Sequence, residues 1–253
     1  VTIDGKHLSM VKPENENDDC YGLILSTLTD TEFANKYTNN EEINIALGKY
    51  DVVVKQLLPK KEALDKNGLK RLVFSLEGLD RREEALKILN EHPKAQEDTD
   101  LMGIIGGRYK RAYLKFPSES DGDAAFVYYD LALEKSTAAK NYGQIYYHAI
   151  NLAFLSIVIE NDKEKMRTYA QLALEATSKC EDDPWKNATI AEANLYLRNF
   201  EKAKEYYLKA AEKSGIREKI SMHLNAYAGY TALMQTDDPE DDFIKFLKNH
   251  FLS

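Results

Sequence analysis

The chain has 253 residues, of which 43% are hydrophobic and 30% are charged, and its formal net charge is −8. This composition is that of a folded globular protein and excludes a disordered chain, which would contain fewer hydrophobic residues. Nucleic acids and anionic membrane surfaces attract clustered lysine and arginine, so an acidic chain favours neither as a partner. No apolar run reaches the roughly 18 residues needed to span a bilayer.

The first segment of the chain differs from the rest. Residues 1–11 resemble a short strand, and residues 13–18 form a solvated polar run that is typical of a linker. We therefore predict a leader or linker over residues 1–18 and a helical-repeat domain over residues 19–253. Because the first residue is valine rather than methionine, we also expect the chain to be a piece of a longer protein.

From residue 20 onward, apolar residues recur with helical spacing and turns separate them. Asp98 offers N-cap chemistry before one helix, and Pro93 and Pro117 end the helices that precede them. After a turn at 48–51, the predicted helices are 64–78, 81–91, 99–116, 123–137, 143–160, 163–179, 184–198, 200–213, 217–234 and 239–251. The predicted fold class is all-α, with five to six antiparallel helical hairpins.

Small or slim residues recur at equivalent places in these hairpins. Ala85, Ala125, Met166 and Ala203 each follow a turn, and their spacings are 40, 41 and 37 residues. Tetratricopeptide (TPR) hairpins repeat every 34 residues or so, and the spacing therefore predicts an irregular TPR-like solenoid. Crossing helices admit only small side chains where they come closest. The residues predicted to be buried between hairpins are Trp185, Ala191, Ala203, Tyr207 and Ala210.

The segment 100–111 combines three glycines with basic residues. Backbone N–H groups of a glycine-rich turn can approach a phosphate, but the preceding strand and the Gly-Lys-Ser/Thr ending of that motif are missing. Close packing of helices at Gly103, Gly106 and Gly107 is therefore the favoured interpretation.

Three segments together resemble a known family. They are the run from Asp100 to Arg111, the run from Tyr146 to Asn151 and the run from Asp183 to Ala193. In this order and spacing they are similar to the TRAF-binding domain of apoptosis-signal-regulating kinases and to its bacterial relatives, over roughly residues 45–235. The resemblance implies a TPR-like scaffold, which helps to recruit signalling adaptors in the kinases and accompanies an effector domain on the same polypeptide in bacteria. It supplies no catalytic residue.

The sequence contains no recognisable catalytic or metal-binding pattern. Its five histidines fall in no zinc-ligand spacing, no Gly-x-Ser-x-Gly elbow occurs, and Cys20 and Cys180 form no redox motif. We therefore expect no enzymatic activity, no metal and no cofactor, and a hydrolase appended to helical repeats is disfavoured. Two free thiols and the lack of a signal-peptide pattern at the start favour the cytoplasm.

Polar residues in the similar segments are the candidates for partner binding. They are Arg108, Lys110, Arg111, Tyr147, His148, Asn151 and Glu192. They place cationic and hydrogen-bonding groups on an acidic chain, so an acidic peptide or protein segment is the expected ligand, bound in a groove between first helices of successive hairpins. The alternative interpretation is that these groups pair with one another, since buried polar groups need partners.

Solenoids expose broad surfaces and have few enclosed pockets, which favours binding over catalysis. The leading functional prediction is a non-enzymatic protein–protein interaction scaffold or regulatory module of a larger bacterial signalling or defence protein. The alternative is a sensor domain that binds a peptide or a small ligand in the solenoid groove.

Overall fold

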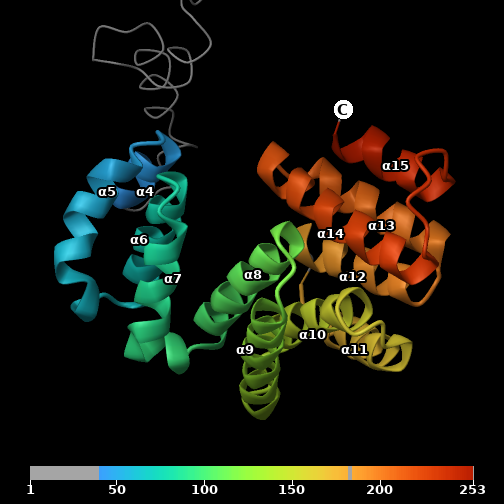
Figure 1. Ribbon diagram of the computed structural model, residues 1–253, viewed down its shortest axis with the longest axis horizontal. Coiled ribbons are helices and arrows are strands. Elements are labelled where there is room, and N and C mark those ends of the chain that lie inside the picture. Colours follow the sequence, from blue (N-terminus) through green and yellow to red (C-terminus); the bar gives the residue numbers. More distant parts are fainter. Residues whose placement is uncertain (1–39, 182–183, 253) are drawn as a thin grey trace, which may run out of the picture. The chain divides into compact units, whose positions relative to one another are not determined.

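The structure is a computed structural model that describes residues 40–181 and 184–252. Every regular element in this part of the chain is a helix (Figure 1). The described residues belong to two compact units, one that ends at Ala95 and one that begins at Gln96. The predicted all-α fold is confirmed. The predicted leader, residues 1–18, lies outside the described residues. None of the described helices is long and apolar enough to cross a membrane.

The first unit is a run of helices that pack in sequence. They are α4 (Asn40–Ala46), α5 (Tyr50–Leu57), α6 (Lys66–Gly78) and α7 (Arg82–Glu91), with 3-10 helices η1 (Leu58–Ala63) and η2 (Pro93–Gln96) after α5 and α7. Helix α6 packs against both α5 and α7. Leu69, Leu72 and Leu76 on α6 are fully buried, so this helix forms the centre of the unit's core.

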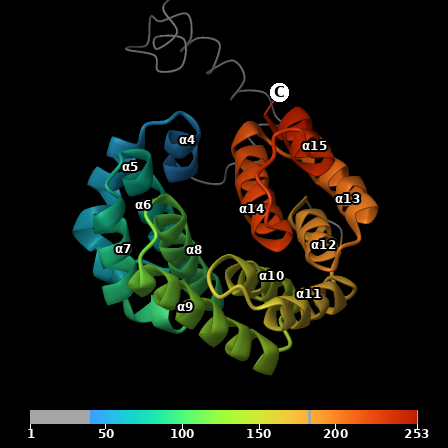
Figure 2. The ribbon, with the colours of Figure 1, turned by 45° about the vertical axis from the view of Figure 1, so that its right-hand side comes forward.

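The second unit is a series of helical hairpins. They are α8 (Thr99–Lys115) with α9 (Glu119–Ala138), α10 (Tyr142–Val158) with α11 (Lys163–Thr177), α12 (Pro184–Tyr196) with α13 (Phe200–Glu212), and α14 (Ile216–Met234) with α15 (Asp242–Phe251). Within this unit the hairpins follow one another along an arc, and their first helices lie on its inner side (Figure 2). Helices α10, α12 and α14 contact one another, which brings distant parts of the sequence together.

Local sequence explains where most helices begin and end. Asp98 accepts hydrogen bonds from two N–H groups of the first turn of α8, both at 3.0 Å, as predicted. Helix α9 begins at Glu119 and not at residue 123, because Ser118 caps it with its hydroxyl group. Left-handed residues, among them Lys140 (φ 53°) and Arg198 (φ 63°), close the turns after α9 and α12.

The predicted core is confirmed at four of five positions. Ala191, Ala203, Tyr207 and Ala210 are fully buried. The prediction for Trp185 is wrong, because 53% of this residue is exposed. It follows directly on Pro184, where α12 begins, and the buried face of this helix starts only two residues later at Asn187.

Candidate binding site

Glycines on α8 admit bulky side chains from the next two helices. A Cβ atom at Gly103 would lie 2.6 Å from Cε1 of Tyr147, and one at Gly106 would lie 3.0 Å from the ring of Tyr129. Any larger residue would push these rings away, so glycine is required for the close approach. The segment 99–115 is helical throughout, which agrees with the packing interpretation and leaves no phosphate-binding turn.

Tyr147 and His148 on α10 pack against these glycines. The hydroxyl group of Tyr147 donates to the carbonyl oxygen of Gly103 at 3.4 Å, and Nε2 of His148 lies 3.0 Å from Oε1 of Gln144. Burial lowers the pKa of His148 to about 4 and raises the pKa of Tyr147. His148 is therefore neutral at physiological pH and offers no positive charge to a ligand.

Lys110 occupies the centre of a second polar group. Lys110 is the one charged residue in the described part of the chain that is buried, with 5% of its surface exposed. Its Nζ donates to Oδ1 of Asn151 at 2.6 Å and to Oδ1 of Asn225 at 3.2 Å, and it lies 4.7 Å from the ring centroid of Phe154. Two hydrogen bonds and a cation–π contact thus compensate the buried ammonium group.

Glu192 completes this cluster from α12. The residue keeps part of its surface exposed, yet burial raises the pKa of its carboxyl group to about 7, against the opposing effects of Lys110 and a hydrogen bond with Asn225. Burial likewise lowers the pKa of Lys110 to about 8, which the charge of Glu192 opposes. Because both pKa values lie near neutrality, a small change in the surroundings alters the charge of the cluster.

The four members of this polar cluster stand at the same place in successive hairpins. Lys110, Asn151, Glu192 and Asn225 lie on α8, α10, α12 and α14, and they are separated by 41, 41 and 33 residues. Lys110 and Asn151 pair with each other, as the alternative interpretation predicts. Asn225 is absent from the sequence prediction, although its distance of 33 residues from Glu192 is close to the TPR period and could have identified it.

Two arginines, Arg108 and Arg111, flank Lys110 in the sequence of α8. Arg108 is half-buried, and its Nη1 donates to the carbonyl oxygen of Ile104 at 2.9 Å, whereas Arg111 is exposed. Both favour the ionised form of Tyr129, whose pKa is nevertheless raised well above its usual value by burial. The seven predicted residues therefore fall into different settings. Lys110, Asn151 and Glu192 belong to the polar cluster, and Tyr147 and His148 pack against the glycines of α8. Arg108 is half-buried on α8, and Arg111 is exposed.

Part of the sequence matches a known protein family. Residues 49–156 match the family described as TPR-S: Tetratricopeptide Repeats-Sensor. The matched segment runs from just before α5 into α10 and contains Lys110 and Asn151. No curated protein matches the sequence significantly. The chain is thus a TPR-like helical repeat module, a coarser description than the predicted resemblance to a TRAF-binding domain. No set of three or more ligands for a metal ion occurs among residues 40–181 and 184–252.

Proposed function

We propose that this chain is a non-enzymatic regulatory module that binds an acidic segment of a protein partner beside the polar cluster. One observation carries the proposal: the buried ammonium group of Lys110 on α8 is hydrogen-bonded by side chains from α10 and α14 and interacts with the charge of Glu192 on α12. A buried charge costs free energy that an apolar residue would not. Such departures from simple packing concentrate at functional sites.

Direct contact with the partner falls to the two arginines of α8 and to Glu192, a cluster member that keeps some exposure. Arg111 and the partly exposed Arg108 supply positive charge, and a partner carboxylate would compete with Glu192 for the electrostatic attraction of Lys110. The pKa of Glu192, about 7, lets it take up a proton when a second negative charge arrives. Because the hydrogen bonds of Lys110 join α8, α10 and α14, binding here would alter the packing of several hairpins at once.

The test uses a fluorescein-labelled poly-glutamate peptide as the probe. We expect Arg108→Ala/Arg111→Ala to weaken the peptide's affinity by about tenfold or more, since hydrogen bonds to charged groups contribute about 1.5–3 kcal/mol. Arg81→Ala/Arg82→Ala, at exposed positions of the first unit, is the matched control and should bind like the unaltered protein. Equal affinities for both double variants, each folded by circular dichroism, would overturn the proposal. A pull-down from the native cell extract with the same variants then identifies the partner.

A small acidic ligand is the second candidate for the same site. The description of the matched family as sensor repeats favours it, and so does a cluster that several helices share. Succinate is a suitable probe, because a ligand that binds only the folded state raises the melting temperature with its concentration. The stabilisation should disappear in Lys110→Met. An unchanged melting temperature at saturating succinate would leave the peptide as the ligand.

We also propose the kind of protein to which this module belongs. The resemblance of three segments to bacterial relatives of the TRAF-binding domain supports a role in a signalling or defence protein of the cytoplasm, with an effector domain on the same polypeptide. The gene that encodes the chain provides the test. An open reading frame without a further domain would contradict this setting while leaving the binding site untouched.

A further inference from the structure

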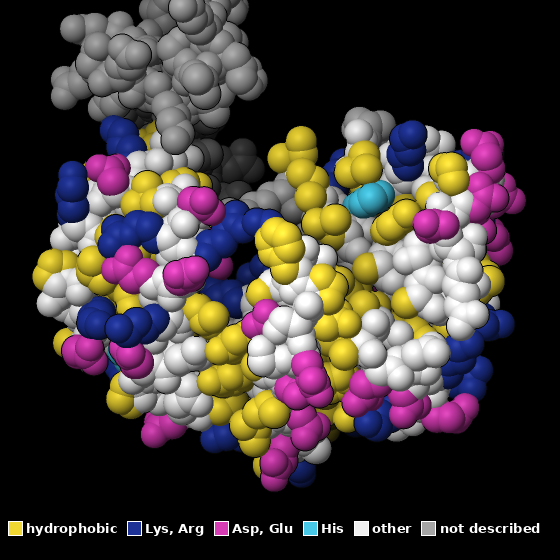
Figure 3. Space-filling view, viewed as in Figure 1, with side chains coloured by type: hydrophobic (Ala, Val, Ile, Leu, Met, Phe, Trp, Pro, Cys, Tyr) yellow, Lys and Arg dark blue, Asp and Glu magenta, His cyan; other side chains and the backbone are white. Residues whose placement is uncertain are grey.

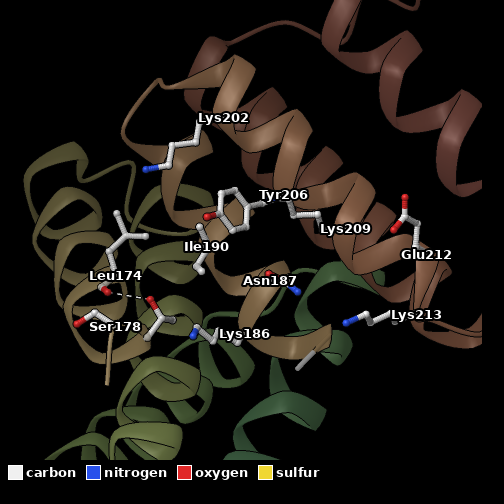
Figure 4. A pocket seen from close by; sticks show the side chains of 11 residues that line it. Leu174, Ser178, Lys186, Asn187, Ile190, Lys202, Tyr206, Lys209, Glu212 and Lys213 are labelled. Carbon is white, nitrogen blue, oxygen red and sulfur yellow. Dashed lines mark hydrogen bonds between the residues drawn. The ribbon is translucent and has the colours of Figure 1, made fainter. Parts of the chain in front are cut away.

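Two hollows in the second unit differ in the side chains that line them. The hollow between α11, α12 and α13, of about 610 Å³, is lined mostly by polar side chains (Figure 4). The hollow on α14, of about 520 Å³, is a groove lined by Ala228, Ala232 and Tyr227 of this helix and by Val158 of α10, with polar groups at the end of α14. The α14 groove therefore has the small and apolar walls that an apolar side chain fits.

The first half of α14 carries apolar side chains that are exposed. Ile216 is 78% exposed, Leu224 is 57% exposed and Ile220 is 44% exposed. More large hydrophobic side chains are exposed on α14 than on any other helix of residues 40–181 and 184–252, and Figure 3 shows hydrophobic side chains at the surface over this helix. A contiguous exposed apolar patch is typical of an interaction surface.

The exposed side chains and the groove belong to one row along α14. Residues four apart form a ridge on a helix, and here the ridge runs through positions 216, 220, 224, 228 and 232. The first three residues of the ridge are isoleucine, isoleucine and leucine, and the last two are alanines. The ridge is therefore large in its first half and small in its second half.

This ridge is complementary to itself. Leu224 and Ala228 are each two residues from Ala226, and Ile220 and Ala232 are each six residues from it. A two-fold axis at the level of Ala226 places a second α14 antiparallel to the first, with large residues opposite small ones in both directions. We infer that two copies of this chain form a symmetric dimer in which each α14 places Ile220 and Leu224 in the groove of the other.

Charge at the two ends of α14 favours the same antiparallel arrangement. Asp237 and Asp238 are exposed beyond the C-terminal end of the helix, whereas Lys219 lies near its start. The neighbouring Glu218 turns back to the start of its own helix, where its Oε2 lies beside Gly215. The helix macrodipole adds positive charge at the start and negative charge at the end. An antiparallel second copy brings each Lys219 toward the acidic end of the other α14.

Sedimentation velocity of the full chain at increasing concentration tests the dimer. A contact along one helix is smaller than a standard interface of about 800 Å² per partner, so we expect a reversible dimer with a dissociation constant of about 1–100 μM. A protein that stays monomeric up to about 1 mM would overturn the inference.

A matched pair of variants decides whether α14 forms the contact. Leu224→Glu should raise the dissociation constant about a hundredfold or more, because it places a carboxylate without a cation in an apolar groove. Val127→Glu on α9, where the side chain is 54% exposed, is the control and should change the dissociation constant by less than about twofold. Both substituted positions are exposed, and circular dichroism checks the fold. A dimer that persists in Leu224→Glu would show that another surface forms it.

Charge reversal tests the two-fold arrangement itself. Lys219→Glu and Asp237→Lys should each weaken the dimer about tenfold, since the axis generates two such pairs per dimer. The double variant should restore the affinity to within about threefold, because each new lysine faces the new glutamate of the other copy. A double variant no tighter than either single variant would overturn the arrangement. Arg108 and Arg111 are unaltered in all of these proteins and the assay contains no peptide, so this inference and the proposed function fail independently.

Discussion

Replacing Lys110 by methionine measures what the buried ammonium group contributes. Methionine keeps an unbranched apolar stem, but it removes the charge and the hydrogen bonds to Asn151 at 2.6 Å and to Asn225 at 3.2 Å. It also leaves the carboxyl group of Glu192 without the cation that lowers its pKa. The substitution therefore isolates electrostatics and hydrogen bonding from packing.

The expected cost follows from these contacts. Removing one partner of a buried ion pair costs about 3–5 kcal/mol. This range is an upper bound here, because the ammonium group of Lys110 hydrogen-bonds to two asparagines and only its charge acts on Glu192. Glu192 keeps some exposure and, with a pKa of about 7, can take up a proton, so we expect the lower end, about 3 kcal/mol. Glu192→Gln alone should cost about 1 kcal/mol, and the double variant about 2 kcal/mol, which gives a coupling of about 2 kcal/mol.

The assay is urea unfolding at neutral pH, followed by circular dichroism in the four proteins of this cycle. The unfolding midpoint should fall while the slope with urea stays constant, since the exposed surface on unfolding is unchanged. Lys55→Met, at an exposed position, is the control and should change stability by less than about 0.5 kcal/mol. If Lys110→Met unfolds like the unaltered protein, or if the two single effects simply add, the cluster is not a coupled network and the reasoning is refuted.

Three further predictions concern pH and packing. The pKa of Glu192 is raised from 4.5 to about 7 on folding, so this group's stabilising effect is complete below pH 4.5 and is lost as the pH rises through 7. The free energy of unfolding should therefore depend less on pH in Glu192→Gln than in the unaltered protein. An unchanged pH dependence would contradict the assignment. Ala203→Leu should destabilise by about 1–3 kcal/mol through overpacking, because Ala203 is fully buried, whereas Glu205→Leu at the surface should not; equal melting temperatures would show that the repeat phasing is wrong. Gly103→Ala should likewise lower the melting temperature, since its Cβ would lie 2.6 Å from a tyrosine ring, while Gly143→Ala, with no contact closer than 3.7 Å, should leave it unchanged or raise it.

The helical hairpins could be predicted because their signals are local. Caps such as Asp98, helix-ending prolines and the spacing of apolar residues act within a few residues, and hence most predicted helices agree with the structure within a few residues. The small residues where two helices come closest, such as Ala203, could also be predicted from the sequence. They recur at equivalent positions of successive hairpins. Trp185 was misplaced because a large apolar residue is buried only where a neighbouring helix covers it.

The candidate sites depended on tertiary structure in a different way. The sequence singled out Lys110, Asn151 and Glu192 as polar residues within helical segments, but it left open whether they face a partner or one another. The path of the hairpins decides this, because it carries α14 back toward α8 and places Asn225 against Lys110, 115 residues earlier in the chain. Likewise, α10 had to pack beside α14 before Val158 could line the groove on α14. The sequence by itself determined the helices and their small-residue contacts, because these depend on interactions between residues close in the chain. The packing of one hairpin on the next decided which distant polar side chains meet and how deeply they are buried.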